Sequence, residues 1–491
     1  MIQNFALSRY RKPYDKCRIL ELRRKKRCIE AHTMNVVWHE TSARVYNRLI
    51  QNGQIASQPM SHLDNSVRTA LALMCLLEVS TLMATATEVA TNTPLAAATH
   101  WGFNHPRNLF AEAGHPATEV KQKVAAAFEQ LFHGDPATQS VFLPAGTNTA
   151  GALAYIHDVG SGDVRSEGMS YGMMIAVQLD KKAEFDALWN WVRTFMYHAD
   201  RNHPTCGFFS WSMSTNGLAN DEMPAPDGEE YFATALYFAA ARWGNDAGCG
   251  DYHAEADQLL TDMRHRPEIT GNTRKGPMSA GALFDGKHRM IRFTPDIANR
   301  NHTDPSYHLP AFYELWSRCG PAADRKFWSQ AAAASREFFQ HAADPVTGLT
   351  PEYANFDGTP WVCPWQPTSV EFQFDAWRTA MNWSVDWAWW GKDPREQQLS
   401  DRLQRFFAAQ GMTNYGNTYT QAGRPTGTDH STGLVAMNAV ASLAATQPCA
   451  QKFVEALWAA PVPAGQWRYY DGMLYLLGLL HCSGEFKIWT P

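Results

Sequence analysis

Three acidic residues stand where helical patterns begin or change, each among residues that would be unusual on a plain surface. Glu167 lies in "SEGMSYGM", Asp227 in "MPAPDGEEYFATALYF" and Asp375 in "VEFQFDAWRTAMNW". Two carboxyl groups in different electrostatic surroundings are the minimum needed to hydrolyse a glycosidic bond, one as proton donor and the other as base. Simpler roles stay open, because a carboxylate in a first helical turn also stabilises the helix dipole and Asp-Gly is a common turn.

Glu167 is the candidate proton donor. Ser166 is expected to cap the helix that follows, and Gly168 and Gly172 are expected to leave room for a ligand beside the carboxyl group. Burial among apolar walls and other acids would raise the pKa of Glu167 enough for it to protonate the leaving oxygen. Asp227 would supply part of that negative charge, which must outweigh the opposing helix dipole.

Asp375 is the candidate base. Arg378 lies three residues further on and therefore on the same helical face. A pair at this spacing can be a surface ion pair contributing well under about 1 kcal/mol, but Phe374, Trp377 and Trp383 argue against a solvated face. A half-buried carboxylate beside a guanidinium stays ionised at neutral pH, which is the state that a general base needs.

The rest of the chain must supply the elements that hold these residues. From about residue 118 onward, apolar-periodic segments alternate with Gly, Pro, Asn and Asp, while strand signals are as short as "GFFSWSM" and "MIRFTP". The pattern predicts an all-α domain. Consecutive helix pairs with unequal loops suit an (α/α)6 barrel of six inner and six outer helices, whose longer loops would form a cleft at one end. An open helical solenoid is the rival, but no fixed-period repeat favours it. The predicted helices span 118–133, 167–180, 184–198, 229–243, 252–264, 306–318, 323–342, 370–390, 394–409, 431–446, 449–459 and 468–481.

Composition excludes few classes. The formal net charge of the 491 residues is -5, which gives no global attraction to nucleic acid or anionic membrane. The 18 Trp, 17 Tyr and 25 Phe would suit a sugar-binding cleft, where flat amphipathic rings stack on sugars, although such rings also fill cores.

The first 97 residues differ from the rest. Residues 1–59 are basic, with "RRKKR", and are interpreted as a disordered or mis-started segment rather than a nucleic-acid patch. Residues 60–97 form a signal-peptide-like segment and linker, with a small-residue cleavage site at Ala84-Thr85-Ala86. The protein is therefore expected to be periplasmic or secreted if Met60 is the true start and cytoplasmic otherwise. Residues 98–491 are the predicted barrel domain.

No metal site is predicted. His198, His203 and Cys206 in "YHADRNHPTC" match no common ligand spacing. The six cysteines after Ala86 lack a C-x-x-C spacing and permit 15 disulfide pairings, so the pairing stays open.

Four ordered blocks resemble glycoside hydrolase family 8, and the resemblance covers about residue 100 to the C-terminus. They are "SEGMSYGMMIAV", "APDGEEYFATALYFAAARWG", "DPSYHLPAFYELW" and "FDAWRTAMNWSVDWAWWG". Within the family the chain is most similar to the reducing-end xylose-releasing exo-oligoxylanases, also through the C-terminal "RYYDGMLYLLGLLHCSGEFKIW". The resemblance implies an (α/α)6 barrel and hydrolysis with inversion at the anomeric carbon, without metal or organic cofactor.

The resemblance also implies roles for particular residues. It places the proton donor at Glu167 and the base at Asp375. It implies that Tyr307 helps to hold the nucleophilic water, that Arg378 fixes the base, and that Trp211 in "FFSWSM" stacks on sugar. The implied substrate-binding residues are Asp227, Tyr307, Arg378, Trp211 and His430.

Two departures from the family pattern bear on specificity. Around the second acid, Pro226, Glu229 and Phe232 replace Thr, Asp and an aliphatic residue, changes that the exo-oligoxylanases mostly share. In "TGTDHSTGL", His430 matches a histidine that in the exo-enzymes lies in a Leu-His-Pro kink and touches the reducing-end hydroxyl. Here Asp and Ser flank that histidine, so exo action stays open.

The leading hypothesis is an inverting, monomeric enzyme that cleaves β-1,4-linked xylo-oligosaccharides and releases xylose from the reducing end. An endo-acting xylanase, glucanase or chitosanase of the same family is the alternative. A catalytically silent carbohydrate-binding barrel would lack Glu167 or Asp375, and both are present. Neither a nucleic-acid partner nor stable membrane insertion is expected.

Overall fold

The computed structural model describes residues 106–245 and 250–490. The predicted segments 1–59 and 60–97 lie outside the described residues, so their boundaries, the cleavage site and the location of the protein stay predictions.

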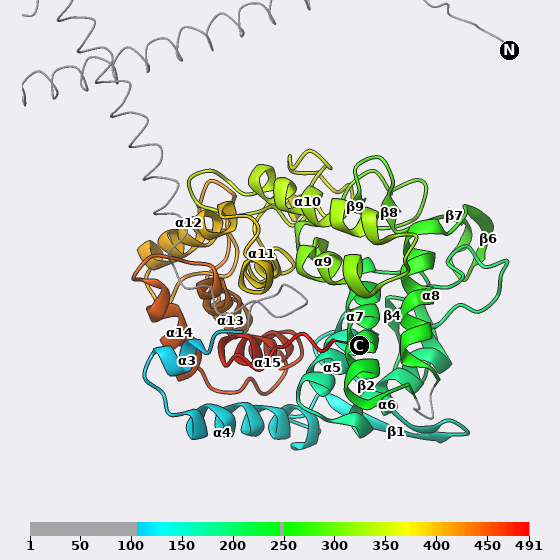
Figure 1. Ribbon diagram of the computed structural model, residues 1–491, viewed down its shortest axis with the longest axis horizontal. Helices are drawn as coiled ribbons and strands as arrows, with labels where there is room; N and C mark the ends of the chain where they lie inside the picture. Colours follow the sequence, from blue (N-terminus) through cyan, green and yellow to red (C-terminus); the bar gives the residue numbers. More distant parts are fainter. Residues whose placement is uncertain (1–105, 246–249, 491) are drawn as a thin grey trace, which may run out of the picture. The chain divides into compact units, whose positions relative to one another are not determined.

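Twelve long helices of the described chain alternate between an inner and an outer ring (Figure 1). The inner helices are α5 (Ser166–Gln178), α7 (Pro226–Trp243), α9 (Pro310–Cys319), α11 (Ala376–Trp390), α13 (Thr432–Val440) and α15 (Tyr470–Cys482). The outer helices are α4 (Ala117–Phe128), α6 (Lys182–Trp191), α8 (Tyr252–His265), α10 (Arg325–Ala342), α12 (Arg395–Gln410) and α14 (Ala450–Ala459). A short helix, α3 (Leu109–Glu112), precedes α4. The (α/α)6 barrel that the sequence predicted is confirmed.

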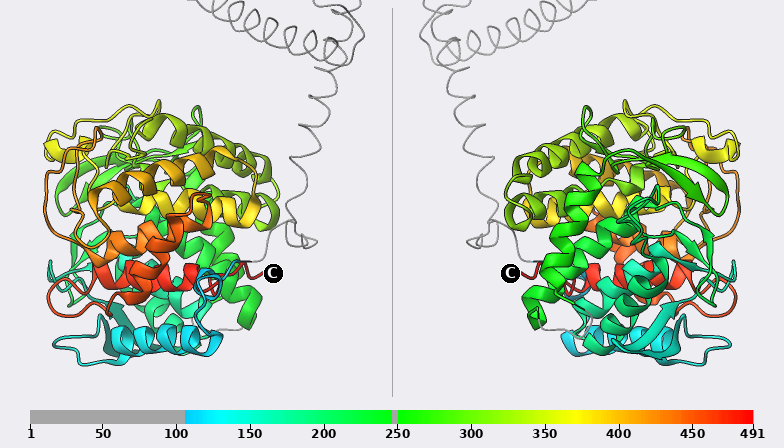
Figure 2. Two further views of the ribbon diagram at one scale, coloured as in Figure 1. Left: turned by 90° about the vertical axis from the view of Figure 1, so that its left-hand side faces the viewer. Right: turned by 90° about the vertical axis from the view of Figure 1, so that its right-hand side faces the viewer.

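Burial separates the two rings. In α5 every residue except Glu167 is buried, whereas α10 buries a stripe of residues at helical spacing, including Phe327, Trp328 and Ala331. A helix that is apolar all round must be enclosed, and one with a single apolar stripe covers a core. The last inner helix, α15, packs against both α13 and α5 and so closes the ring. Figure 2 shows α4 (cyan) at one edge of the domain, beside α15 (red), which it contacts.

Some helix starts differ from the sequence-based prediction. Pro226 takes the first position of α7, where its missing N–H costs nothing, so Asp227 lies inside the first turn and not before the helix. Ser166 is the first residue of α5 and not its cap, and its hydroxyl is buried without a partner. The segment before Asp375 is also not part of α11: Pro367–Val370 form a 3-10 helix, η5, and Asp375 is the N-cap residue.

The described strands are short and antiparallel. Those expected within residues 207–213 and 290–295 are confirmed as β4 (Ser212–Met213) and β9 (Met290–Ile291). The hairpins β1–β2 (Phe142–Asn148, Gly151–Ile156) and β6–β7 (Ile269–Thr273, Gly276–Ala280) lie where no particular strand was predicted. The remaining strands are β3 (Val164–Arg165), β5 (Ala219–Asp221) and β8 (Phe284–Asp285), which pair as β3–β4–β5 and β8–β9.

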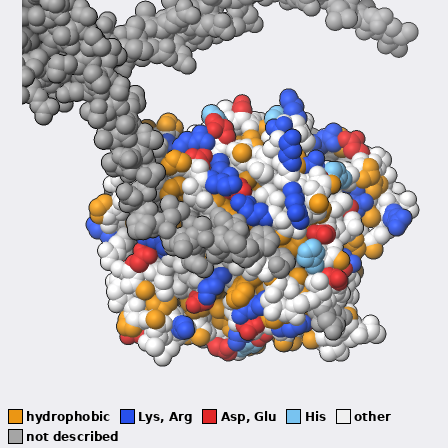
Figure 3. Space-filling view, in the orientation of Figure 1, with side chains coloured by type: hydrophobic (Ala, Val, Ile, Leu, Met, Phe, Trp, Pro, Cys, Tyr) orange, Lys and Arg blue, Asp and Glu red, His pale blue; other side chains and the backbone are white. Residues whose placement is uncertain are grey.

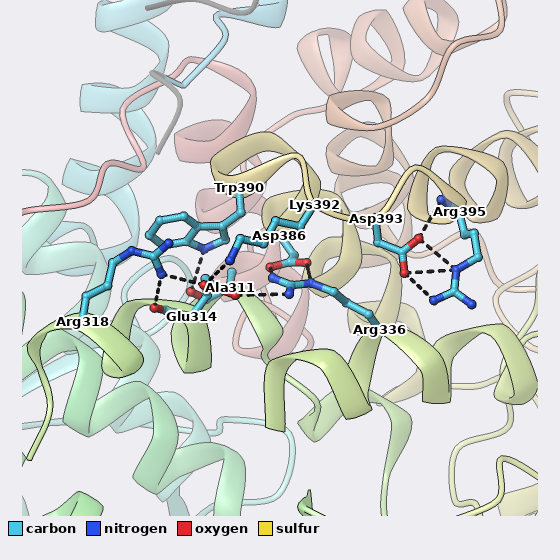
Figure 4. A network of polar contacts seen from close by, with 9 residues as sticks. All are labelled: Ala311, Glu314, Arg318, Arg336, Asp386, Trp390, Lys392, Asp393 and Arg395. Carbon is cyan, nitrogen blue, oxygen red and sulfur yellow. Dashed lines mark hydrogen bonds and ion pairs between the residues drawn. The ribbon is translucent and has the colours of Figure 1, made fainter. Parts of the chain in front are cut away.

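A buried ion network fixes α11 against its neighbours (Figure 4). Arg336 of α10 makes two contacts with Asp386 of α11, at 2.6 and 2.8 Å, and a third with Glu314 of α9 at 3.1 Å. Lys392 follows α11 and contacts Glu314 at 2.5 Å. A buried charge that is paired on each side resists displacement, because losing one partner leaves the other charge uncompensated. The network therefore holds the helix that carries Arg378.

One face of the molecule carries side chains of both charges. On the face drawn in Figure 3, basic and acidic side chains are interspersed with apolar and uncharged groups. Within residues 106–245 and 250–490, no helix is both long and apolar enough to cross a membrane. The cysteines of this part of the chain, Cys206, Cys319, Cys363, Cys449 and Cys482, are unpaired.

Candidate active site

The candidate site lies where the inner helices begin. Glu167 is the second residue of α5, Asp227 the second of α7, and Asp375 the N-cap of α11. Tyr307 ends the 3-10 helix η4 (Pro305–Tyr307) just before α9, and Tyr469 is the N-cap of α15. Inner helices of such a barrel run in one direction, so their first turns converge on one end. Side chains separated by hundreds of residues therefore meet there.

Arg378 joins the three predicted acids. Its Nη1 atom lies 2.9 Å from Glu167 Oε2 and 2.7 Å from Asp227 Oδ2, and its Nη2 atom lies 2.9 Å from Asp375 Oδ1. The guanidinium is buried, and Nη1 also donates to the hydroxyl of Tyr171 at 2.6 Å. The prediction that Arg378 contacts Asp375 is confirmed, and the structure extends that pair into a cluster of one cation with three carboxyl groups.

A tyrosine holds the other oxygen of Glu167. The Tyr469 hydroxyl donates to Glu167 Oε1 at 2.9 Å. A Cβ atom on Gly168 would lie 2.5 Å from the Tyr469 ring, and one on Gly172 would lie 2.8 Å from Ile156. The prediction that these glycines leave room for a ligand is therefore wrong. Their missing side chains make room for other parts of the protein, and Gly168 lets Tyr469 reach the carboxyl group.

The electrostatic surroundings separate Glu167 from an ordinary carboxyl group. Burial raises its pKa to about 7, and the charges of Asp375 and Asp227 add to that rise while Arg378 opposes it. Burial also raises the pKa of Asp227, with Asp375 contributing. The predicted direction for Glu167 is confirmed, and its pKa suits a group that must give up a proton near neutral pH.

A cavity of about 710 Å³ opens over these groups. Glu167, Asp227, Asp375 and Arg378 all line it. The candidate substrate-binding residues Trp211 and Tyr307 line it as well. The backbone carbonyl of Trp211 accepts a hydrogen bond from the Ser166 amide at 3.0 Å, which ties β4 to the start of α5.

His430 is the one predicted site residue that the structure does not bring to this cavity. It is exposed, precedes α13, and its Nδ1 atom lies 2.9 Å from the carbonyl oxygen of Tyr415. His430 does not cap α13, because the N-cap residue is Ser431 and no side chain caps this helix. The hydroxyl of Ser431 instead accepts from the Asn417 amide at 2.9 Å.

Three further residues at the site were missed by sequence reasoning. Asp304 is buried, accepts from the Ser306 amide at 2.6 Å, and has a pKa raised well above its usual value by burial and by the charge of Asp375. Tyr469 and Glu352 contribute a phenol and a carboxyl group. Asp304 and Tyr469 lie in blocks that resemble the family, "DPSYHLP" and "RYYDG", whereas no sequence signal marked Glu352.

The fold and the site together define a glycoside hydrolase built on an (α/α)6 barrel, with paired carboxyl groups around one arginine in an open cavity. Residues 156–484 match the family model described as "Glycosyl hydrolases family 8". The chain belongs to this family.

Known relatives agree with this assignment. The chain is 42% identical over 384 residues to the reducing-end xylose-releasing exo-oligoxylanase Rex8A of Paenibacillus barcinonensis, covering 78% of this chain and 96% of the relative. It is 56% identical to the protein in the crystal structure of a GH8 xylobiose complex from Teredinibacter turnerae, with a TM-score of 0.78 over 79% of this chain and 98% of that chain. A second structure from that organism, with the same identity, TM-score and coverage, is described as a catalytic mutant xylohexaose complex of a xylanase.

Proposed function

We propose that this chain hydrolyses β-1,4-linked xylo-oligosaccharides with inversion and releases xylose from the reducing end. The observation that carries the proposal is the sharing of one buried guanidinium by Glu167, with its pKa near 7, and by Asp375. Relatives named for xylose release, and solved neighbours holding xylobiose or xylohexaose, support a xylan-derived substrate.

In the proposed reaction Glu167 protonates the glycosidic oxygen as the bond to the anomeric carbon breaks. Asp375 takes a proton from the water that attacks the opposite face of the sugar. Arg378 keeps both carboxyl groups in place through its two Nη atoms. Asp227 accepts hydrogen bonds from sugar hydroxyls, and Tyr307 helps to hold the water.

The two contacts with Arg378 set an upper limit on the separation of the Glu167 and Asp375 carboxyl groups. Because the two Nη atoms of one guanidinium lie about 2.3 Å apart, the Glu167 and Asp375 oxygens, each 2.9 Å from a different Nη atom, lie no more than about 8 Å apart. Inverting enzymes need roughly 6.5 to 9.5 Å between the carboxyl groups. The largest carboxyl separations that the two contacts with Arg378 permit fall within that range.

Endo action is the second candidate. Two observations favour it: His430 lies outside the cavity wall, on the surface, and the 56% identical neighbour is described as a xylanase. An enzyme without a barrier beyond the first leaving sugar would accept longer chains on that side. The two candidates share their chemistry and differ in how the reducing end is recognised.

Xylotriose and its reducing-end methyl glycoside distinguish them. Under the exo proposal the methyl glycoside is cleaved at least about tenfold more slowly, because a buried polar partner of the free hydroxyl is left unpaired or the methyl group clashes. Product chromatography measures both rates. Equal cleavage rates for xylotriose and its methyl glycoside would reject exo action in favour of endo action.

His430→Ala then tests the histidine itself. If His430 recognises the reducing end, this variant narrows the rate difference between the two substrates more than it lowers the rate of bond cleavage. His341→Ala, on the exposed face of α10, is the matched control and should leave the difference unchanged.

We also propose that the protein acts as a monomer and is exported when translation begins at Met60. The small-residue site at Ala84-Thr85-Ala86 supports export.

A further inference from the structure

Glu352 is a buried carboxyl group in the cavity wall that does not contact Arg378 directly. Its side chain is 3% exposed, and it lies in the long connection between α10 and η5. Its backbone N–H donates to the carbonyl of Glu371 at 2.9 Å, which fixes the connection beside the segment leading to Asp375. Glu352 lines the cavity together with Tyr353, Trp365 and Gln366. A buried acid facing a sugar-sized cavity requires an account of its hydrogen bonds.

Two glutamine amides meet on one oxygen of this carboxyl group. Gln366 Nε2 and Gln373 Nε2 both donate to Glu352 Oε2, each at 2.5 Å. The orientation of both amides is supported by a second contact: the Tyr353 hydroxyl donates to Gln366 Oε1 at 3.5 Å, and Gln373 Nε2 also donates to Thr368 Oγ1 at 3.1 Å. Oε2 therefore accepts both of these hydrogen bonds and does not carry the proton. If the group is protonated, the proton belongs on Oε1.

The other oxygen of Glu352, Oε1, belongs to a side chain that lines the cavity. No group in the described part of the chain donates to it or accepts from it, and it is not among the buried polar atoms that are sealed from solvent without a partner. Trp365 lines the same cavity with 59% of its surface exposed, so the cavity offers an apolar face as well as this polar group. That combination is what a sugar ring, with its apolar face and peripheral hydroxyls, requires.

The surroundings keep this acid neutral at neutral pH. Burial and the charge of Asp375 raise the pKa of Glu352 to about 8, while the two amides and Arg378 oppose that rise. The phenol of Tyr353 adjoins it, and the charge of Asp304, the N-cap residue of η4, acts on Tyr353. Ionisation of Glu352 would place a second negative charge beside Asp375 and would remove the proton from Oε1.

We propose that Glu352 is a substrate-binding residue of this cleft that donates a hydrogen bond from Oε1, as a neutral carboxylic acid, to an oxygen of the bound sugar. The proposal rests on the proposed function, since it takes a xylo-oligosaccharide as the ligand. It adds a donor to a cavity in which, under the proposed function, Asp227 accepts hydrogen bonds from sugar hydroxyls. Trp365 provides the apolar contact for the same sugar unit.

Two substitutions show whether Glu352 acts as a hydrogen-bond donor or as an ionised carboxylate. Glu352→Gln keeps an acceptor for the two glutamine amides and an N–H donor in place of the acid proton, so kcat/KM for xylohexaose at pH 6 should fall only about threefold. Glu352→Ala removes the donor and should lower kcat/KM about thirtyfold or more, mainly through KM. Equal losses in the two variants, or a normal Glu352→Ala enzyme, would overturn the proposal. Glu371→Gln, outside the cavity wall, is the matched control and should behave as wild type.

Binding gives a readout that a merely structural role would not move. In a Glu167→Gln background, which prevents turnover, calorimetric affinity for xylohexaose should weaken on the order of tenfold between pH 6 and pH 9.5, because Glu352 loses its proton as the pH passes about 8. The Glu167→Gln, Glu352→Gln double variant should show no such change. A parallel pH dependence in both proteins contradicts the proposal even if Glu352→Ala fails to fold.

The failure of this proposal is distinguishable from failure of the proposed function. If the wild-type enzyme neither binds nor cleaves xylohexaose, the proposed substrate is wrong. If it does both and the Glu352 variants depart from the expected order, only the role of Glu352 is wrong.

Discussion

Glu167→Ala is expected to lower kcat on xylohexaose by on the order of a thousandfold or more while the protein still folds, because the leaving oxygen loses its proton donor. The Glu167 side chain is 14% exposed, is held by Arg378 and Tyr469, and has a pKa of about 7. Since the acid must be protonated to act, wild-type kcat/KM should fall as pH rises through about 7. The residual kcat/KM of Glu167→Ala should not fall over the same pH range.

Steady-state kinetics from pH 5 to pH 9, with thermal unfolding to confirm folding, measure both effects. Glu112→Ala, a substitution of an exposed acid in α3, is the matched control and should retain wild-type rates. More than about a tenth of wild-type activity in Glu167→Ala would refute the role given to Glu167.

Asp375→Asn should lower kcat at least as strongly, because an amide cannot accept the proton of the attacking water. The amide oxygen can still accept from Arg378 Nη2, which lies 2.9 Å from Asp375 Oδ1 in the wild type. The substitution therefore removes the base while keeping the contact that positions it. Affinity for xylohexaose should change by less than about tenfold, which separates lost chemistry from lost binding.

Single-turnover rates and calorimetric affinity measure the two effects of Asp375→Asn. The exposed loop residue Asp357, changed to Asn, is the control. A variant whose rate is preserved would show that another group accepts the proton, and a variant that loses binding and rate in equal measure would show that Asp375 only holds the sugar.

The helices and the candidate catalytic residues could both be predicted from the sequence, and for the same physical reason. Inner helices are apolar on all sides, so a carboxylate at the start of one is conspicuous, and Glu167, Asp227 and Asp375 all stand there. The all-α fold followed from the alternation of such segments with punctuating residues, and the resemblance to glycoside hydrolase family 8 implied the closed (α/α)6 barrel. Sequence-based reasoning placed α11 too early, because Phe372 and Phe374 continue its apolar pattern although they belong to the connection before it.

What could not be predicted depends on encounters between distant segments. Tyr469 reaches Glu167 across 302 positions, and the space vacated by Gly168 is filled by that same ring. Glu352 gains its character from Gln366, Gln373 and the nearby Asp375, which no local pattern reveals. The β1–β2 hairpin was missed because much of β1 is exposed and gives no apolar alternation.

The anomeric configuration of the first product tests the central claim most directly. Proton NMR during the first minutes of xylohexaose hydrolysis, before mutarotation equilibrates the new reducing end, distinguishes the two anomers. The account predicts that the α-anomer appears first from the β-linked substrate, because water attacks opposite the leaving group with Asp375 as base. First appearance of the β-anomer would contradict it, since retention requires a carboxylate to form a covalent intermediate with the sugar.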